Sequence, residues 1–155
     1  MKDYIPKVLL IDDIPQNIQV LGSFLSELNY HLSFATSASE ALRLTTVNSY
    51  DLILLDIMMP DMDGFELCEK IKQCENLSDV PIIFISARTD HESILKGFTI
   101  GGVDYITKPF NSHELLARVK THIELRKQKL LLSRINSDLE DIVMQRTVEL
   151  RNANK

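Results

Sequence analysis

The stretch Leu52–Gly64, LILLDIMMPDMDG, joins a short apolar run to a carboxylate and a turn. Its first four residues are large and aliphatic, which is typical of a strand that is buried on both faces. Asp56 follows the run directly, and the Pro and Gly residues after it predict a turn. In open α/β sheets, ligands bind beyond the carboxyl ends of the strands. Asp56 is therefore either a reactive carboxylate or, more simply, a cap for the next helix.

Similar apolar runs alternate with helical patterns on both sides of this stretch. Capping boxes at Ser37–Glu40 and Asp63–Glu66 mark two of the helix starts. Strands that are apolar throughout need cover on both faces, which favours a parallel sheet between two layers of helices. We expect a doubly wound α/β fold. Besides Leu52–Leu55, the predicted strands are Lys7–Ile11, His31–Ala35, Pro81–Ile85 and Val103–Ile106.

The composition restricts the class of protein. With 155 residues, one domain and an appendage are expected, and a net charge of -5 argues against a direct nucleic-acid partner. The N-terminal stretch MKDYIPKVLLIDD lacks the pattern of a signal peptide. No segment approaches the ~20 apolar residues that cross a bilayer. Cys68 and Cys74 have no metal or redox spacing. We expect a cytoplasmic protein with no membrane partner.

Polar residues stand at the ends of four predicted strands: Asp12 and Asp13, Asp56, Ser86 and Lys108. In a parallel sheet these ends share one edge, so we expect the side chains to lie close together. Clustered carboxylates suit a hard cation such as Mg²⁺, which also binds phosphate oxygens. A hydroxyl and an ammonium group would stabilise a phosphoryl group, and a carboxylate is able to accept it as a nucleophile.

Four blocks of sequence resemble, in order, the response-regulator receiver domain of two-component signalling. They are KVLLIDD (7–13), LILLDIMMPDMDGFEL (52–67), PIIFISA (81–87) and GGVDYITKPFN (101–111). The resemblance implies a flavodoxin-like, five-stranded parallel sheet of order 2-1-3-4-5. We expect this receiver to occupy residues 1–125.

The resemblance also implies the chemistry of the site. Asp56 matches the residue that accepts a phosphoryl group from a sensor histidine kinase. Asp12, Asp13, Asp56 and the backbone carbonyl of Met58 match the ligands of the Mg²⁺ cofactor. Such a receiver catalyses its own phosphorylation and dephosphorylation but turns over no separate substrate.

A switch mechanism follows from the same family. Ser86 matches the hydroxyl that bonds the phosphoryl group, and Lys108 matches the ion-pairing lysine, whose peptide bond to Pro109 is usually cis. Phosphorylation of Asp56 would draw Ser86 inward, and Tyr105 would rotate into the vacated space. This movement would alter the face formed by the fourth helix, the fifth strand and the fifth helix.

Two other functions compete with this interpretation. A Mg²⁺-dependent phosphatase with Asp56 as nucleophile needs a general acid, typically two residues further on, and Met58 is unable to donate a proton. Asp61–Gly64 resembles a phosphatase motif and a calcium loop, but a turn and a helix cap explain it more simply. A receiver-like scaffold without phosphorylation would not need the acids, Ser86 and Lys108.

The remaining residues, 126–155, predict an extended C-terminal helix, since no Pro or Gly occurs after Phe110. Gln128, Arg146 and Glu149 interrupt its heptad pattern, and Val143 and Leu150 favour a shifted seam near the end. The segment resembles coiled-coil-like linkers that join receivers to kinase, cyclase or phosphodiesterase domains. We expect a homodimer through this helix and an output domain beyond it. The apolar heptad positions are Leu125, Leu132, Ile135, Leu139 and Ile142.

Overall fold

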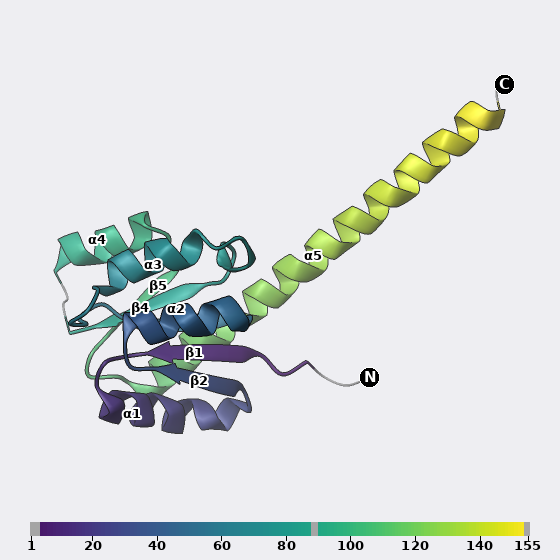
Figure 1. The fold of residues 1–155 in the computed structure, drawn as a ribbon. Helices are drawn as coiled ribbons and strands as arrows, with labels where there is room; N and C mark the ends of the chain where they lie inside the picture. Colours follow the sequence, from purple (N-terminus) through teal and green to yellow (C-terminus); the bar gives the residue numbers. More distant parts are fainter. Residues whose placement is uncertain (1–3, 88–89, 154–155) are drawn as a thin grey trace. The chain divides into compact units, whose positions relative to one another are not determined.

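The computed structural model describes residues 4–87 and 90–153, which form an α/β unit followed by a long helix (Figure 1). Two short 3-10 turns, η1 (Ser26–Leu28) and η2 (Glu75–Leu77), follow α1 and α3. The main elements in order are β1 (Lys7–Ile11), α1 (Pro15–Leu25), β2 (His31–Ala35), α2 (Ala38–Val47), β3 (Leu52–Asp56), α3 (Gly64–Lys72), β4 (Ile82–Ser86), α4 (His91–Thr99), β5 (Asp104–Thr107) and α5 (Ser112–Ala153).

The five strands form one parallel sheet of order β2-β1-β3-β4-β5. This confirms the predicted flavodoxin-like topology and its extended C-terminal helix. Asp56 and Ser86, expected just after their strands, are instead the last residues of β3 and β4. Asp56 is paired with Ile85, and Ser86 with Thr107. Backbone pairing continues past the last apolar side chain, because a ladder hydrogen bond does not depend on the side chain's polarity.

Apolar side chains fill both faces of the sheet. Along β3, Leu52 and Leu54 belong to the layer formed with α1 and the first turns of α5, and Ile53 and Leu55 to the opposite layer. Figure 1 shows α2, α3 and α4 on one face and α1 on the other. The alternation follows from the two-residue period of a strand, so each central strand is buried on both sides. Burial also raises the pKa of the Cys68 thiol in this core to about 11.

Side-chain caps fix two helix starts next to the predicted site. The Ser37 hydroxyl accepts a hydrogen bond from the backbone N–H of Glu40 at 3.1 Å. The Asp63 carboxylate accepts one from the backbone N–H of Glu66 at 2.9 Å. Both capping boxes are therefore confirmed. Asp63 serves as the helix cap, as expected from the simpler interpretation of Asp61–Gly64.

The chain divides into two compact units, residues 1–123 and 124–155. In the second unit, the apolar heptad residues have exposed side chains, for example 60% for Leu132 and 53% for Leu139. Among the described residues, no helix combines the length and the apolar character that crossing a bilayer requires.

Candidate functional site

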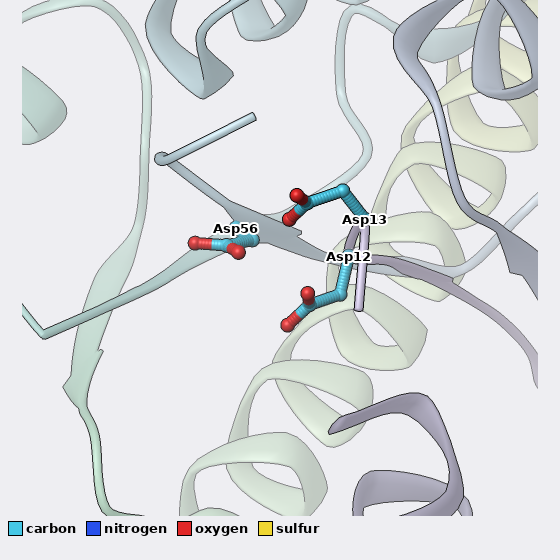
Figure 2. A group of neighbouring side chains, drawn as sticks. All are labelled: Asp12, Asp13 and Asp56. Carbon is cyan, nitrogen blue, oxygen red and sulfur yellow. The ribbon is translucent and has the colours of Figure 1, made fainter. Parts of the chain in front are cut away.

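Three carboxylates meet at the carboxyl ends of β1 and β3 (Figure 2). Asp12 and Asp13 follow β1 directly, and Asp56 is the last residue of β3. Each contributes a carboxylate oxygen, and these oxygens lie within 4.8 Å of one another. The two strands are neighbours in the sheet, so residues far apart in the sequence share this edge, as the strand pattern predicts.

The three acids have different surroundings. Asp12 is 1% exposed and accepts a hydrogen bond from the backbone N–H of Ile14 at 2.9 Å. Asp56 is 2% exposed and accepts one from the backbone N–H of Met58 at 3.1 Å. One oxygen of Asp13, Oδ1, is buried without a hydrogen-bond partner among the described residues. Because a buried polar atom without a partner is costly, Asp13 is the acid with an unused ligand atom.

Lys108 connects two of these acids. Its Nζ lies 3.3 Å from Asp12 Oδ2 and 3.2 Å from Asp56 Oδ2. Its backbone N–H donates to the carbonyl of Ser86 at 2.9 Å, which fixes the start of the loop after β5. The Lys108–Pro109 peptide bond is cis, as the resemblance implies. In the part of the chain that the structure describes, this ammonium group partly neutralises an edge that carries three acids.

Among the described residues, the acids of the cluster outnumber the nearby cations, and the pKa of Asp56 reflects this. Burial raises the pKa of Asp56 to about 6, and the nearby Asp12 carboxylate acts in the same direction. The Lys108 ammonium and the Met58 N–H lower it, but they do not compensate. Asp56 is therefore mainly ionised at neutral pH, at an electrostatic cost that an added cation would remove.

Ser86 and Tyr105 lie deeper in the structure. Ser86 is fully buried at the end of β4. The side chain of Tyr105 is 8% exposed and packs within the apolar layer that includes Phe65 and Phe84. The ring thus already occupies an inward position. Its rotation on phosphorylation stays a prediction.

A second polar cluster beside Tyr105 was not expected from the sequence. Asp104 Oδ1 accepts hydrogen bonds from Arg118 Nη1 and, at 2.9 Å, from the backbone N–H of Tyr105. Asp104 Oδ2 lies 3.0 Å from His122 Nε2. The only signal in the sequence is a pair of basic residues four apart, which face the same side of a helix. Their acidic partner lies on another element.

A loop contact near the site was also missed. Asp61, in the loop after β3, accepts a hydrogen bond from the backbone N–H of Ala38 at 3.0 Å. Ala38 is the first residue of α2, so Asp61 neutralises part of the positive end of that helix. This bond joins the loop after β3 to a different helix from the one that Asp63 caps.

The fold and the site match a known family over most of the chain. Residues 8–120 match the response regulator receiver domain. The chain belongs to this receiver family. The transcriptional regulatory protein SpaR of Bacillus subtilis is 44% identical, over 76% of this chain and 51% of its own length. A crystal structure of a two-component response regulator from Clostridium difficile is 37% identical, with a TM-score of 0.72, over 77% of this chain and 96% of that chain.

Another relative covers the receiver and most of the C-terminal helix. The protein named "Probable cyclic di-GMP phosphodiesterase" of Vibrio cholerae is 36% identical over 92% of this chain. The match spans 32% of that relative, so this chain corresponds to about a third of its length. These curated relatives are thus considerably longer than the receiver that they share with this chain.

Proposed function

We propose that this receiver is a phosphorylation-dependent signalling switch in which Asp56 accepts a phosphoryl group from a histidine kinase. The observation that carries the proposal is the convergence of three carboxylates with Lys108, whose ammonium group contacts both Asp12 and Asp56. Family membership supports the signalling role. The identity of the donor and the roles of the individual residues are part of the proposal.

Mg²⁺ is the cofactor that this donor set fits. Asp12, Asp13 and Asp56 offer hard, anionic oxygens within 4.8 Å of one another, and Asp13 Oδ1 has no other partner. We propose these carboxylates and the backbone carbonyl of Met58 as its protein ligands. When bound, the ion would supply the positive charge that the cluster lacks.

Residues of the chain itself would carry out the other steps of phosphoryl transfer. The ionised Asp56 carboxylate attacks the phosphorus atom, the P–N bond to the donor imidazole breaks, and a P–O bond forms. Lys108 contacts Asp56 already, and its ammonium group would stabilise the oxygens of the transferred group. The Ser86 hydroxyl would donate a hydrogen bond to one of these oxygens.

The conformational change would pass from the site through β4 and β5 to the output face. We propose that Ser86 moves toward the phosphoryl group and that Tyr105 responds, changing the face formed by α4, β5 and α5. The tail of α5 would then pair with a second copy and lead to an output domain. The longer relatives, one named as a transcriptional regulator and one as a phosphodiesterase, support a further domain of this kind.

Mass spectrometry of the intact chain tests the phosphoacceptor. Acetyl phosphate with Mg²⁺ should add one phosphoryl group, and peptide mapping should place it on Asp56. An Asp56→Asn variant should remain unlabelled, and EDTA should suppress labelling of the wild type. Unchanged labelling of the variant would reject Asp56 as the acceptor.

Two further variants separate the remaining roles. Asp13→Ala should weaken Mg²⁺ binding and slow phosphorylation at least tenfold, because outer and inner metal-site partners typically contribute 10- to 100-fold. Lys108→Ala should still accept some phosphate, because lysine is not the nucleophile, but Tyr105 should lose its NMR response. If labelling proceeds equally well in EDTA, the metal role is wrong. A normal Tyr105 response in Lys108→Ala would reject the coupling role.

A further inference from the structure

We propose that residues 124–153 pair with the same segment of a second copy as a parallel, in-register coiled coil whose direction is set by Glu124 and Lys129. The inference rests on the dimer proposed above and specifies its geometry. It concerns the second compact unit of the chain, which has no apolar core of its own among its described residues.

An exposed apolar stripe identifies the seam. Its members occupy a and d positions of a coiled coil, with spacings of three or four residues from Leu132 onward and with Gln128 at the seam position between Leu125 and Leu132. Each is a large aliphatic side chain that is between 43% and 60% exposed. They are Leu125, Leu132, Ile135, Leu139 and Ile142.

Open hollows lie between side chains along the stripe. One groove is lined by Leu125 and Leu132 together with polar neighbours that include Lys129. A second, next along the helix, is lined by Leu139 and Val143. In a coiled coil, a seam side chain of one helix inserts into the space between such residues of the other. The occupant with a matching stripe is a second copy of this helix.

Charge complementarity favours the parallel direction. In a parallel coiled coil, the residue before each a position faces the residue five places further on in the other helix. This spacing places Glu124 beside Lys129 of the second copy, and two-fold symmetry forms the pair twice. The two residues are five apart in one chain, so they do not face each other within their own helix.

The antiparallel alternatives leave this charge pair unmade. One alignment places Leu132 against Ile142 of the second copy and Ile135 against Leu139, and Asp138 then faces Asp138 of the second copy, which is destabilising. Another places Leu125 against Ile142 and Leu132 against Ile135, which stacks as many apolar layers and avoids that repulsion. Neither alignment brings Glu124 beside Lys129, because residues before an a position then face one another.

The end of the seam limits its strength. Arg146 and Glu149 follow at the next a and d positions, where charged residues weaken a coiled coil. Their opposite charges, one turn apart, partly compensate each other. Val143 and Leu150 offer an apolar path that is shifted by one residue, which locally changes the winding of the two helices. The pairing is thus strongest from Leu125 to Ile142.

Disulfide trapping tests the direction of pairing. In the parallel alignment, Leu125→Cys should link to itself, because the two positions are adjacent. In the two antiparallel alignments these positions are about 36 Å and about 26 Å apart by helix rise, and Leu125→Cys should instead link to Glu149→Cys or to Ile142→Cys in a mixture. Lys127→Cys, on the outer face, is the matched control. Peptide mass spectrometry distinguishes these links from links through Cys68 or Cys74.

Charge exchange tests the residues that set the direction. Lys129→Glu should weaken dimerisation about fivefold in sedimentation experiments, and adding Glu124→Lys should restore it. Lys127→Glu changes the net charge equally and should have little effect. A monomeric full chain at high micromolar concentration, a 125–149 or 125–142 link without a 125–125 link, or failure of the rescue would each overturn the proposal. Failure of Asp56 labelling would instead count against the proposed function alone, since pairing is measured without phosphate.

Discussion

Two parts of one helix differ in whether their aliphatic side chains are buried or exposed. In α5, Val119 and Ile123 are 0% and 4% exposed, whereas Leu125 and Leu132 are 54% and 60% exposed. The backbone hydrogen bonds continue through both parts, so helix formation does not distinguish them. Burial depends on whether another element offers a surface: the sheet covers the first turns, and the described chain covers nothing of the later stripe. The comparison teaches that the same aliphatic residue stabilises the fold in one part and is available for association in the other.

The strongest test of this comparison truncates one leucine in the buried core and one leucine in the exposed stripe of α5. Leu54→Ala, in the fully buried strand β3, should lower the free energy of unfolding by about 3 kcal/mol, since it leaves a cavity between packed layers. Leu132→Ala should change it by less than about 0.5 kcal/mol in the monomer but weaken dimerisation. Urea denaturation at low protein concentration measures both. Equal losses in the two variants would mean that the tail stripe is buried in the folded monomer.

Replacements of two glycines compare a crowded position with an open one within the receiver. A Cβ at Gly64 would lie 2.6 Å from the carbonyl oxygen of Asp56, so Gly64→Ala should cost about 1–3 kcal/mol and slow phosphorylation. At Gly22, inside α1, the nearest atom would be 3.8 Å away. Gly22→Ala should therefore be neutral or stabilising by up to about 1 kcal/mol. Thermal unfolding and labelling rates of the two variants provide the check, and a harmless Gly64→Ala would contradict the close packing under Asp56.

A smaller effect concerns charge and depends on pH. The pKa of Asp56 in the fold, about 6, lies above its ordinary value of 3.8, so the folded state binds more protons between these values. Stability without metal should fall as the pH rises through this window, and the full penalty applies above pH 6. Asp56→Asn should therefore be more stable than the wild type at pH 7.5 by about 1 kcal/mol, and this advantage should vanish near pH 4.

The matched control for this pH effect lies in the tail. Asp141→Asn also removes a carboxylate, but from an exposed helix face, and should change the stability by less than about 0.5 kcal/mol at either pH. Chemical denaturation in EDTA across the pH range provides the measurement. A wild type that becomes more stable between pH 4 and pH 6 through Asp56 would show that its pKa is lowered rather than raised.

The smallest effect should come from removing the tail altogether. A chain that ends at Leu125 retains every residue of the first compact unit, including Ile123. Its unfolding free energy at low concentration should match that of the full chain within about 0.5 kcal/mol, because the first unit is compact by itself. A loss well above this value would show that the tail stabilises the receiver. Equal dimerisation of the truncated chain would move the interface to the receiver surface.

Local patterns were sufficient for much of the fold. Apolar runs predicted the strands, and Ser37 and Asp63 predicted helix starts that the structure confirms, since caps are made between neighbours in the sequence. The doubly wound architecture followed from strands that need cover on both faces, and the strand order followed from the resemblance to receiver domains. Strand ends were less predictable, and Asp56 and Ser86 belong to β3 and β4, since the pairing partner decides where a ladder ends.

The sequence by itself determined the order of the elements, the place of the acids at strand ends and the continuity of the last helix, because each depends on residues a few positions apart. Only the tertiary structure distinguished Asp12, paired with Lys108, from Asp13, which keeps a buried oxygen without a partner. Only the tertiary structure revealed the contacts of Asp104 with Arg118 and His122. These contacts join different elements. Packing brings such residues together, and no local period or propensity records which side chains will meet.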